Sequence, residues 1–375
     1  MLKPEKIIHA INEGIFELEN TSFTADELYN AALAREQLEQ LHALYKTRAP
    51  SGSKISEKYH HRNLKTSLDQ DFVLSPENID ECTRAYVEYR INHGRKFLLI
   101  HKLTDKDIQS FTANTAADFN HLKIEPEIFL DDDSIDAQAI PLRTIYKRTT
   151  PDLSILLFFE GVETFSSSQP SDNLLSQEGL KLKNQIRVKK KVISYGFHRV
   201  VIDTKNKLLI ALLDVNTLDK KEDPSDKFYS LINLLRHKLG ITNFMDKLNL
   251  LGFFPSLDKL FNDKSVGIVK EVYLHTSAGA RSLNTTKVVE SDVRDDVFLK
   301  GGIEAEEQEI AITKLNLSWP NIEGTPELKL KGDFIMFENP KEALFWSEVL
   351  FSAKSAGQAD FLIKPLEYAI NENDD

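Results

Sequence analysis

Two apolar runs stand in the middle of this chain, Ile193-Ser-Tyr-Gly-Phe-His-Arg-Val-Val-Ile-Asp203 and Leu208-Leu-Ile-Ala-Leu-Leu213, and the polar turn Thr204-Lys-Asn-Lys207 joins them. The first run is rich in the β-branched and aromatic residues that suit a pleated surface, so the pair predicts a β-hairpin. The second run is apolar at every position. This pattern is typical of a central strand that is covered on both faces.

A helix is predicted directly after the hairpin, opening at Pro224 or Ser225. Apolar residues then recur on one face at helical spacing: Phe228, Leu231, Ile232, Leu235 and Leu239. Residues 236–238 are Arg-His-Lys, and the free carbonyl groups of a last helical turn favour cations. Gly240 supplies the left-handed residue that commonly ends a helix. We expect the apolar face of this helix to pack on the hairpin.

A basic run precedes the hairpin. It places six cations within residues 181–191, with no acid among them, in a protein whose formal net charge is -11. Cations on an extended segment beside a hairpin can follow a phosphate backbone. The candidate nucleic-acid-binding residues are therefore Lys181, Lys183, Arg187, Lys189, Lys190, Lys191 and Arg199, and Lys205 would extend the patch.

Two structural explanations compete with nucleic-acid binding. The basic run and the acidic segment 290–309 could neutralise each other within one domain. Alternatively, the lysines could keep an edge strand from pairing with another chain. The run also lacks interleaved aromatic residues, which are the stacking platforms of single-strand binders.

Length and composition indicate a packed protein of two domains. The chain has 375 residues, more than one hydrophobic core usually holds, and its 41% hydrophobic and 28% charged residues are typical of globular proteins. No apolar run approaches the roughly 20 residues that cross a bilayer, and residues 1–8 lack the apolar core of a signal peptide. We therefore expect a cytoplasmic protein without membrane contact. The single cysteine, Cys82, excludes an intramolecular disulfide and a cysteine-based zinc cluster.

The predicted fold class is α+β, beginning with a helix-rich N-terminal domain that also contains strands. In this domain, residues 1–165, we expect helices at about 24–46, 75–94 and 105–122 and strands at 96–101 and 153–159. The helix at 24–46 is predicted to pack on its own domain rather than to form a coiled coil, because its apolar stripe is short. Residues 166–173, Ser-Ser-Ser-Gln-Pro-Ser-Asp-Asn, have the composition of a linker, and we place the domain boundary there.

The C-terminal domain, residues 174–370, is predicted to hold a mainly antiparallel sheet with helices on one face. After the hairpin and its helix, we expect one or two short helices between 243 and 261 and strands at 269–275, 309–319 and 327–337. A helix is predicted from Asn339 to Phe351, a short strand at 361–365 and a disordered tail at 371–375. The acidic segments 131–136 and 290–309 are expected to be solvated loops.

The absence of motifs removes several enzyme classes. The sequence contains no Gly-x-x-x-x-Gly-Lys loop, no Gly-x-Gly-x-x-Gly turn, no His-Glu-x-x-His pair and no Gly-x-Ser-x-Gly elbow. We therefore expect neither an ATPase, a dehydrogenase, a zincin nor an α/β-hydrolase, and we expect no cofactor and no metal.

One pattern keeps an enzyme hypothesis open. Asp292, Asp295 and Asp296 precede a predicted strand that carries Glu327-Leu-Lys329. Nucleases of the PD-(D/E)xK type need an Asp upstream of a Glu-x-Lys on a strand, where two carboxylates hold magnesium and the lysine orients water. No Pro-Asp pair stands before this pattern, and so short a pattern is common in charged proteins.

The sequence therefore favours a non-catalytic binding or assembly protein that contacts nucleic acid through the local basic patch. The alternatives are a metal-dependent nuclease of PD-(D/E)xK type and a purely structural oligomeric scaffold. The sequence leaves open whether the partner is a nucleic acid, another protein or a second copy of the chain.

Overall fold

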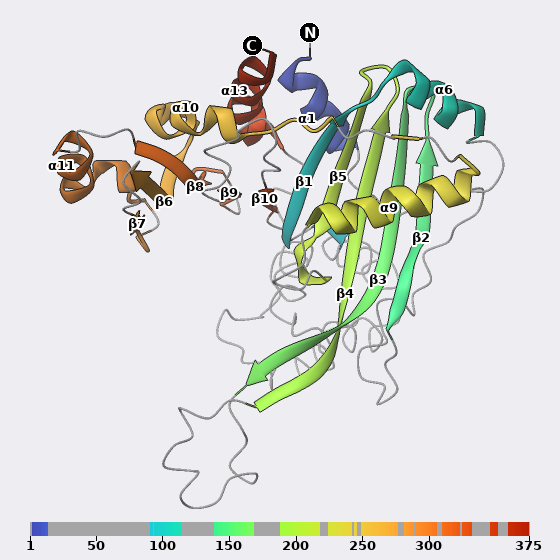
Figure 1. Cartoon of the computed structure of the whole chain (residues 1–375), viewed down its shortest axis with the longest axis horizontal. Helices are drawn as coiled ribbons and strands as arrows, with labels where there is room; N and C mark the ends of the chain where they lie inside the picture. The colour runs from blue at the N-terminus through green and yellow to red at the C-terminus, as the bar shows by residue number, and fades with distance from the viewer. Residues whose placement is uncertain are drawn as a thin grey trace, which may run out of the picture.

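The structure is a computed structural model of an α+β protein (Figure 1). It describes residues 2–13, 91–92, 94–114, 139–168, 188–217, 224–241, 244–245, 249–276, 281–288, 290–305, 310–322, 325–331, 346–351 and 359–374. Several predictions lie outside these residues: the helix at 24–46, most of the helix at 75–94, the acidic loop at 131–136, and the side chains of Cys82, Lys181, Lys183 and Arg187.

One antiparallel sheet organises the described residues. Its strands follow the order β2-β3-β4-β5-β1-β10-β9-β8-β6-β7. They span Gly94–Lys102 (β1), Ile140–Thr149 (β2), Leu153–Ser168 (β3), Val188–Asp203 (β4), Leu208–Asp214 (β5), Ile268–Thr276 (β6), Arg281–Thr285 (β7), Ile310–Ser318 (β8), Glu327–Lys331 (β9) and Trp346–Phe351 (β10).

Helices flank the sheet and fill its connections. The α-helices span Pro4–Glu13 (α1), Asp105–Asn114 (α6), Pro224–Leu239 (α9), Leu257–Asn262 (α10), Val297–Ala305 (α11) and Ile363–Asp374 (α13). Short 3-10 helices occupy Val215–Thr217 (η2), Phe254–Ser256 (η3), Lys264–Val266 (η4), Val293–Asp295 (η5) and Asp360–Leu362 (η6).

The predicted central hairpin is confirmed. β4 and β5 pair from Asp203↔Leu208 to Arg199↔Leu212, and every residue of β5 is buried. β5 lies between β4 and β1, so both of its edges are paired as well. The turn is fixed by Asp203, whose carboxylate accepts hydrogen bonds from the backbone N–H and the side-chain amide of Asn206 at 2.8 and 2.7 Å.

The helix after the hairpin is also confirmed, with its start, its end and its apolar face. Phe228, Leu231 and Leu235 of α9 are completely buried against one face of the hairpin. Gly240 has a φ of 65° and ends the helix, because the N–H of Ile241 then reaches the carbonyl of Arg236 at 2.9 Å. Figure 1 shows α9 lying across β3, β4 and β5.

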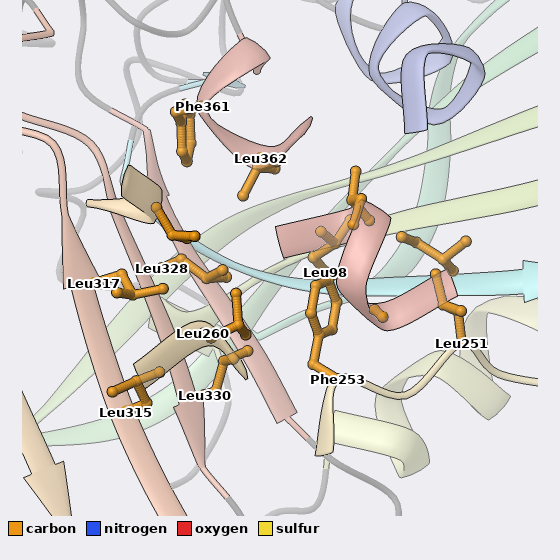
Figure 2. Close-up of a cluster of buried hydrophobic side chains, with 14 of the residues drawn as sticks. Leu98, Leu251, Phe253, Leu260, Leu315, Leu317, Leu328, Leu330, Phe361 and Leu362 are labelled. Carbon is orange, nitrogen blue, oxygen red and sulfur yellow. The ribbon is translucent and has the colours of Figure 1, made fainter. Parts of the chain in front are cut away.

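The opposite face of the hairpin is covered too, which differs from the prediction of helices on one face only. Leu208, Ile210 and Leu212 share a buried cluster with α1, α10 and α13. Figure 2 shows another part of the same cluster, where the leucines of β8 and β9 lie beside Leu260 of α10 and Phe253. Because alternate residues of β5 point to opposite faces, its unbroken apolar sequence needs both layers.

Of the boundary predicted at residues 166–173, the structure describes residues 166–168. Residues 166–168 belong to β3 and pair with residues 188–190 of β4. β1, from the predicted N-terminal domain, lies between β5 and β10 of the predicted C-terminal domain. The described strands on the two sides of the boundary therefore form one continuous sheet, and the serines extend a strand rather than end it.

Four predictions in the C-terminal part of the chain are wrong. Trp346–Phe351 forms strand β10 instead of a helix, because pairing with β9 and β1 satisfies both of its edges, and a short apolar run fits either structure by periodicity. The predicted strand at 361–365 and the predicted disordered tail both lie in η6 and α13, whose buried residues Leu362, Leu366 and Ala369 follow a helical period. The acidic segment expected to be a loop contains helix α11.

No helix among the described residues combines the length and the apolar composition that a bilayer crossing requires.

We expect Leu235→Ala to lower the free energy of unfolding by about 2 to 5 kcal/mol, because it would leave a cavity between α9 and the hairpin. The matched control is Lys238→Ala, one turn further along the same helix at an exposed position, which should change stability by less than about 0.5 kcal/mol. Urea denaturation followed by circular dichroism measures both. Equal, small effects of the two substitutions would contradict the packing described for α9.

Candidate nucleic-acid interface

Strands β3 and β4 continue beyond their neighbours β2 and β5 as a two-stranded arm, defined here as residues 161–168 and 188–195. The pairing of β2 with β3 ends at Gly161, and the pairing of β5 with β4 ends at Arg199. β3 and β4 pair with each other for eight further residue pairs, from Gly161↔Tyr195 to Ser168↔Val188. The arm is therefore about 26 Å long at ~3.3 Å per residue. Figure 1 shows it projecting from the rest of the sheet.

Three of the predicted nucleic-acid-binding residues lie on this arm. Lys189, Lys190 and Lys191 are consecutive residues of β4 and pair with residues 167, 166 and 165 of β3. The prediction that the basic run is extended and lies beside the hairpin agrees with the backbone of these three residues. The lysines belong to the same strand as the first half of the hairpin.

Arg199, in contrast, is not part of an exposed patch. Its side chain is 6% exposed, and its guanidinium donates a hydrogen bond to the side-chain oxygen of Asn92 at 2.9 Å. Burial lowers the pKa of Arg199 to about 10, and its Nε atom has no hydrogen-bond partner among the described residues. A buried guanidinium cannot contact a phosphate, so we exclude Arg199 from the residues proposed below to bind nucleic acid.

Lys205 lies at the opposite end of β4 from the arm. It follows Asp203 in the hairpin turn and forms an exposed ion pair with Asp152 at 3.6 Å. The twelve residue-to-residue steps of strand from Lys191 to Asp203 span about 40 Å. Lys205 therefore does not extend the run of lysines on the arm.

Close backbone packing fixes the base of the arm. A Cβ atom on Gly161 would lie 2.7 Å from the ring of Tyr195, and one on Gly196 would lie 2.4 Å from Thr217 of η2. The Tyr195 ring stacks on Phe159 with ring centres 5.5 Å apart. These contacts leave room only for glycine at the two positions where the arm leaves the sheet.

A buried charge cluster lies beside the base, on the face of the sheet that α9 covers. Glu160 of β3 accepts hydrogen bonds from Lys227 of α9 at 2.8 Å and from Nε2 of His198 at 3.0 Å. Nδ1 of His198 accepts the backbone N–H of Asp214 at 3.0 Å, so the ring proton lies on Nε2. Burial opposes the ionisation of Glu160, but the bonds from His198 and Lys227 and the charge of Lys227 outweigh it and lower its pKa to about 2.

A second buried ion pair ends strand β5. The carboxylate of Asp214 accepts a hydrogen bond from Lys96 of β1 at 2.7 Å and one from the backbone N–H of Phe197 at 3.4 Å. Lys96 also donates to the carbonyl of Phe197 at 3.3 Å. The carboxylate of Asp214 thus satisfies a backbone N–H of β4 beyond Arg199↔Leu212, the last pair between β4 and β5. Here strand β4 of the arm separates from β5.

Sequence reasoning missed the residues that hold the base of the arm. Glu160 and Asp214 each follow directly on an unbroken apolar strand, and a carboxylate in that place needs a buried cation. That signal points to a partner but does not identify it. Lys96 and Lys227 come from segments far away in the chain, so only the fold brings them together.

The carboxylates of the nuclease pattern have other partners. Asp292 is bound by Arg294, whose Nε lies 2.9 and 3.0 Å from its two oxygens. Asp295 is exposed and pairs with Lys264 at 2.6 Å. Asp296 accepts the backbone N–H groups of residues 298 and 299 at the start of α11, at 2.8 and 3.0 Å.

The strand carrying Glu327 and Lys329 is present as β9, and a lysine of β6, Lys270, interacts with the charges of both Glu327 and Asp292. The charges of Asp292 and Glu327 raise the pKa of Lys270 against a stronger lowering by burial. Its Nζ donates to the carbonyls of Val288 and Ser291 at 2.7 and 3.0 Å. Within the described part of the chain, no three His, Cys, Asp or Glu side chains are grouped so that they could hold a metal ion.

No protein-family model matches this chain, and no curated protein is similar to it at a significant level.

We expect Glu160→Ala to lower the free energy of unfolding by about 3 to 5 kcal/mol, because it leaves the ammonium of Lys227 buried without its counter-charge. Glu163→Ala is the matched control: it removes a carboxylate three residues further along the same strand, at an exposed position, and should cost less than about 1 kcal/mol. Thermal unfolding measures both. A cost for Glu160→Ala as small as that of the control would show that the cluster does not hold the base together.

We expect stability to depend on pH through His101, a buried histidine at the end of β1 away from Lys96. Burial lowers the pKa of His101 to about 4 although the charge of Asp107 opposes this, and its Nδ1 accepts the N–H of Asn249 at 2.8 Å. The folded state holds the neutral ring, so its contribution is complete above about pH 6.5 and is lost as the pH falls from 6.5 towards 4.

His101→Asn keeps a hydrogen-bond acceptor but cannot titrate, so the variant should lose the decline between pH 6.5 and 4.5 that the wild type shows in urea titrations. Both proteins should still lose stability below about pH 4.5, where Glu160 begins to protonate in the unfolded state. An unchanged slope above pH 4.5 in the variant would assign the decline to other groups.

Proposed function

We propose that this protein is a non-catalytic binding protein whose two-stranded arm contacts the phosphate backbone of a nucleic acid. The observation that carries the proposal is the position of Lys189, Lys190 and Lys191. They lie where β4 pairs only with β3 among the described strands, beyond the last pairs that β3 makes with β2 and that β4 makes with β5. A two-stranded ribbon of this kind is narrow enough to enter the major groove of duplex DNA.

The charge of the arm supports this proposal because it opposes that of the whole chain. The arm strands contain the three lysines and one carboxylate, Glu163, whereas the chain as a whole has a formal net charge of -11. The intervening sequence, residues 169–187, adds Lys181, Lys183 and Arg187 against Asp172 and Glu178. An acidic protein repels nucleic acid over most of its surface, so binding has to use such a local concentration of cations.

The buried cations at the base of the arm also support the proposed phosphate contact. Lys96 and Lys227 are each neutralised by a buried carboxylate, and Arg199 is buried on Asn92. These cations hold the arm to the sheet and do not compete with the arm for phosphate. The lysines at 189–191 and the cations of residues 181–187 are therefore the groups that we assign to phosphate contact.

Duplex DNA of about 20 base pairs is the first probe. Three to six phosphate contacts should give a slope of about -3 to -5 for log affinity against log salt, since each contact contributes roughly -0.9. The variant Lys189→Glu, Lys190→Glu, Lys191→Glu should abolish binding at 50 mM salt while its circular dichroism spectrum stays that of the wild type. Fluorescence anisotropy measures the affinity.

The matched control reverses three lysine charges elsewhere: Lys238→Glu, Lys287→Glu and Lys331→Glu, all at exposed positions outside the arm. It carries the same change in net charge and should keep at least a third of the wild-type affinity. Equal losses in the two variants would mean that net charge, and not the arm, governs binding. A wild-type protein that binds neither duplex DNA, single-stranded DNA nor RNA at low salt would remove the proposal.

Two further measurements distinguish the nuclease and the scaffold from a nucleic-acid-binding protein. A cut that requires magnesium and is lost in both Asp295→Ala and Glu327→Ala would favour the nuclease. A protein that binds no nucleic acid and elutes as a large assembly in size-exclusion chromatography with light scattering would favour the scaffold.

A further inference from the structure

The two outer strands of the sheet, β2 and β7, differ in how they are protected against pairing with another chain. β2 carries Pro141 and cations at positions 143, 147 and 148, and its register with β3 shifts twice. Prolines, cations and irregular register are the features that protect an exposed edge. β7, Arg281-Ser-Leu-Asn-Thr285, has no proline and only one cation, and it pairs with β6 in an unbroken register. Among the described strands, the outer edge of β7 is therefore open.

The backbone of β7 directs hydrogen-bonding groups to this open edge. The N–H of Thr286 donates to the carbonyl of Lys270 at 3.0 Å, and these two residues continue the register of the β6–β7 ladder. Hydrogen-bonded and non-hydrogen-bonded pairs alternate in an antiparallel ladder. The backbone groups of residues 282 and 284 therefore face β6, and those of residues 281, 283 and 285 face the open edge.

Exposed apolar side chains lie at the same end of the sheet. Leu283 of β7 is 56% exposed, and Val297 and Phe298 at the start of α11 are 80% and 92% exposed. Val288, also exposed, is held beside β6 because its carbonyl accepts a hydrogen bond from Lys270 at 2.7 Å. Figure 1 shows α11, β6 and β7 together at this end. Such a group of exposed apolar residues is typical of a protein interaction site.

The charge of this region favours a second copy of the chain as the partner. Residues 281–300 contain as many cations as carboxylates, whereas the whole chain has a formal net charge of -11: Arg281, Lys287, Arg294 and Lys300 stand against Glu290, Asp292, Asp295 and Asp296. Two copies of an acidic protein repel each other over most of their surfaces. A segment without net charge is where they can approach.

We propose that two copies of this chain form a dimer by antiparallel pairing of their β7 strands, with a twofold axis at Leu283. Leu283 then exchanges N–H···O=C bonds with Leu283 of the second copy, and residues 281 and 285 pair across the axis. This register uses all the backbone groups that face the open edge, and it joins the two sheets into one. The two Leu283 side chains lie opposite each other on one face. A five-residue strand buries little surface, so we expect the apolar residues near α11 to add to the interface.

Sedimentation velocity of the full chain at about 1 to about 200 µM tests the association, because a dimer forms by mass action. The average mass of the wild type should rise from 42.7 kDa towards twice this value as the concentration increases. Leu283→Lys places two ammonium groups opposite each other at the axis and should weaken the dimer at least tenfold. Since Leu283 is exposed in the single chain, the melting temperature of the dilute variant should stay close to that of the wild type.

Amide hydrogen exchange at single-residue resolution identifies the strand that pairs. The N–H groups of residues 283 and 285 should exchange quickly in dilute wild-type protein and become protected at high concentration. Those of residues 282 and 284 face β6 and should be protected at both concentrations. In Leu283→Lys the concentration dependence at residue 285 should disappear.

Two controls separate this interface from other causes of association. Tyr229→Lys introduces the same charge at an exposed aromatic residue of α9, away from β7, and should dimerise as the wild type does. The arm variant Lys189→Glu, Lys190→Glu, Lys191→Glu should also dimerise normally, which excludes a nucleic acid that bridges two arms and keeps this test independent of the proposed function.

Three results would overturn the proposed dimer. The first is a wild type that stays monomeric over the whole concentration range, which would leave the open edge for a strand of another protein. The second is an equal loss of association in Tyr229→Lys and Leu283→Lys. The third is a dimer whose formation leaves the exchange of residues 283 and 285 unchanged.

Discussion

The burial of β5 on both faces and along both edges is the constraint on which the rest of the structure depends. All seven of its residues are buried, with alternate side chains entering two separate apolar clusters. A strand of this kind cannot lie at the surface of a two-layer protein, so it requires α9 on one side and α1, α10 and α13 on the other. It also requires β4 and β1 as partners, which places the hairpin at the centre and joins the two halves of the sheet through β1.

The end of β5 decides where the arm begins. The apolar run stops at Asp214, which still pairs with Lys96 of β1, and its carboxylate accepts hydrogen bonds from the side chain of Lys96 and from the backbone of β4. On the other face of the sheet, the carboxylate of Glu160 accepts hydrogen bonds from His198 and Lys227. Buried ion pairs add little net stability compared with apolar packing, but they are strongly destabilised when one member is lost. Here they fix the place where two strands leave the sheet, and they keep the internal cations away from the surface that we assign to phosphate contact.

The sequence was informative where apolar periodicity was long and uninterrupted. The hairpin, α9 with its glycine end, and the strands β1, β6 and β8 were predicted close to their observed bounds, because α9 follows a helical period and the strands are short apolar or alternating runs bounded by polar residues. Trp346–Phe351 was assigned to the wrong type because pairing with β1 and β9, and not its own pattern, makes it a strand. The basic residues 189–191 could be recognised from their charge alone. The depth of Arg199 could not, since a strand residue next to Val200 gives no sign of which face and which layer will cover it.

The position of β1 has a consequence for the order in which the protein can assemble. β1 pairs on one edge with β5 and on the other with β10, so residue 96 meets residue 214 and also residue 349. As the chain is synthesised, the second edge of β1 remains open until residues 346–351 have been made, while the hairpin side is already complete. An open edge beside Leu98 and Leu99 is a template for pairing with other chains, and non-local strand pairing is slow. We therefore expect the sheet to form first on the hairpin side and to be completed when β10 pairs with β1. Until that pairing forms, the free edge of β1 is where a nascent chain is most exposed to aggregation.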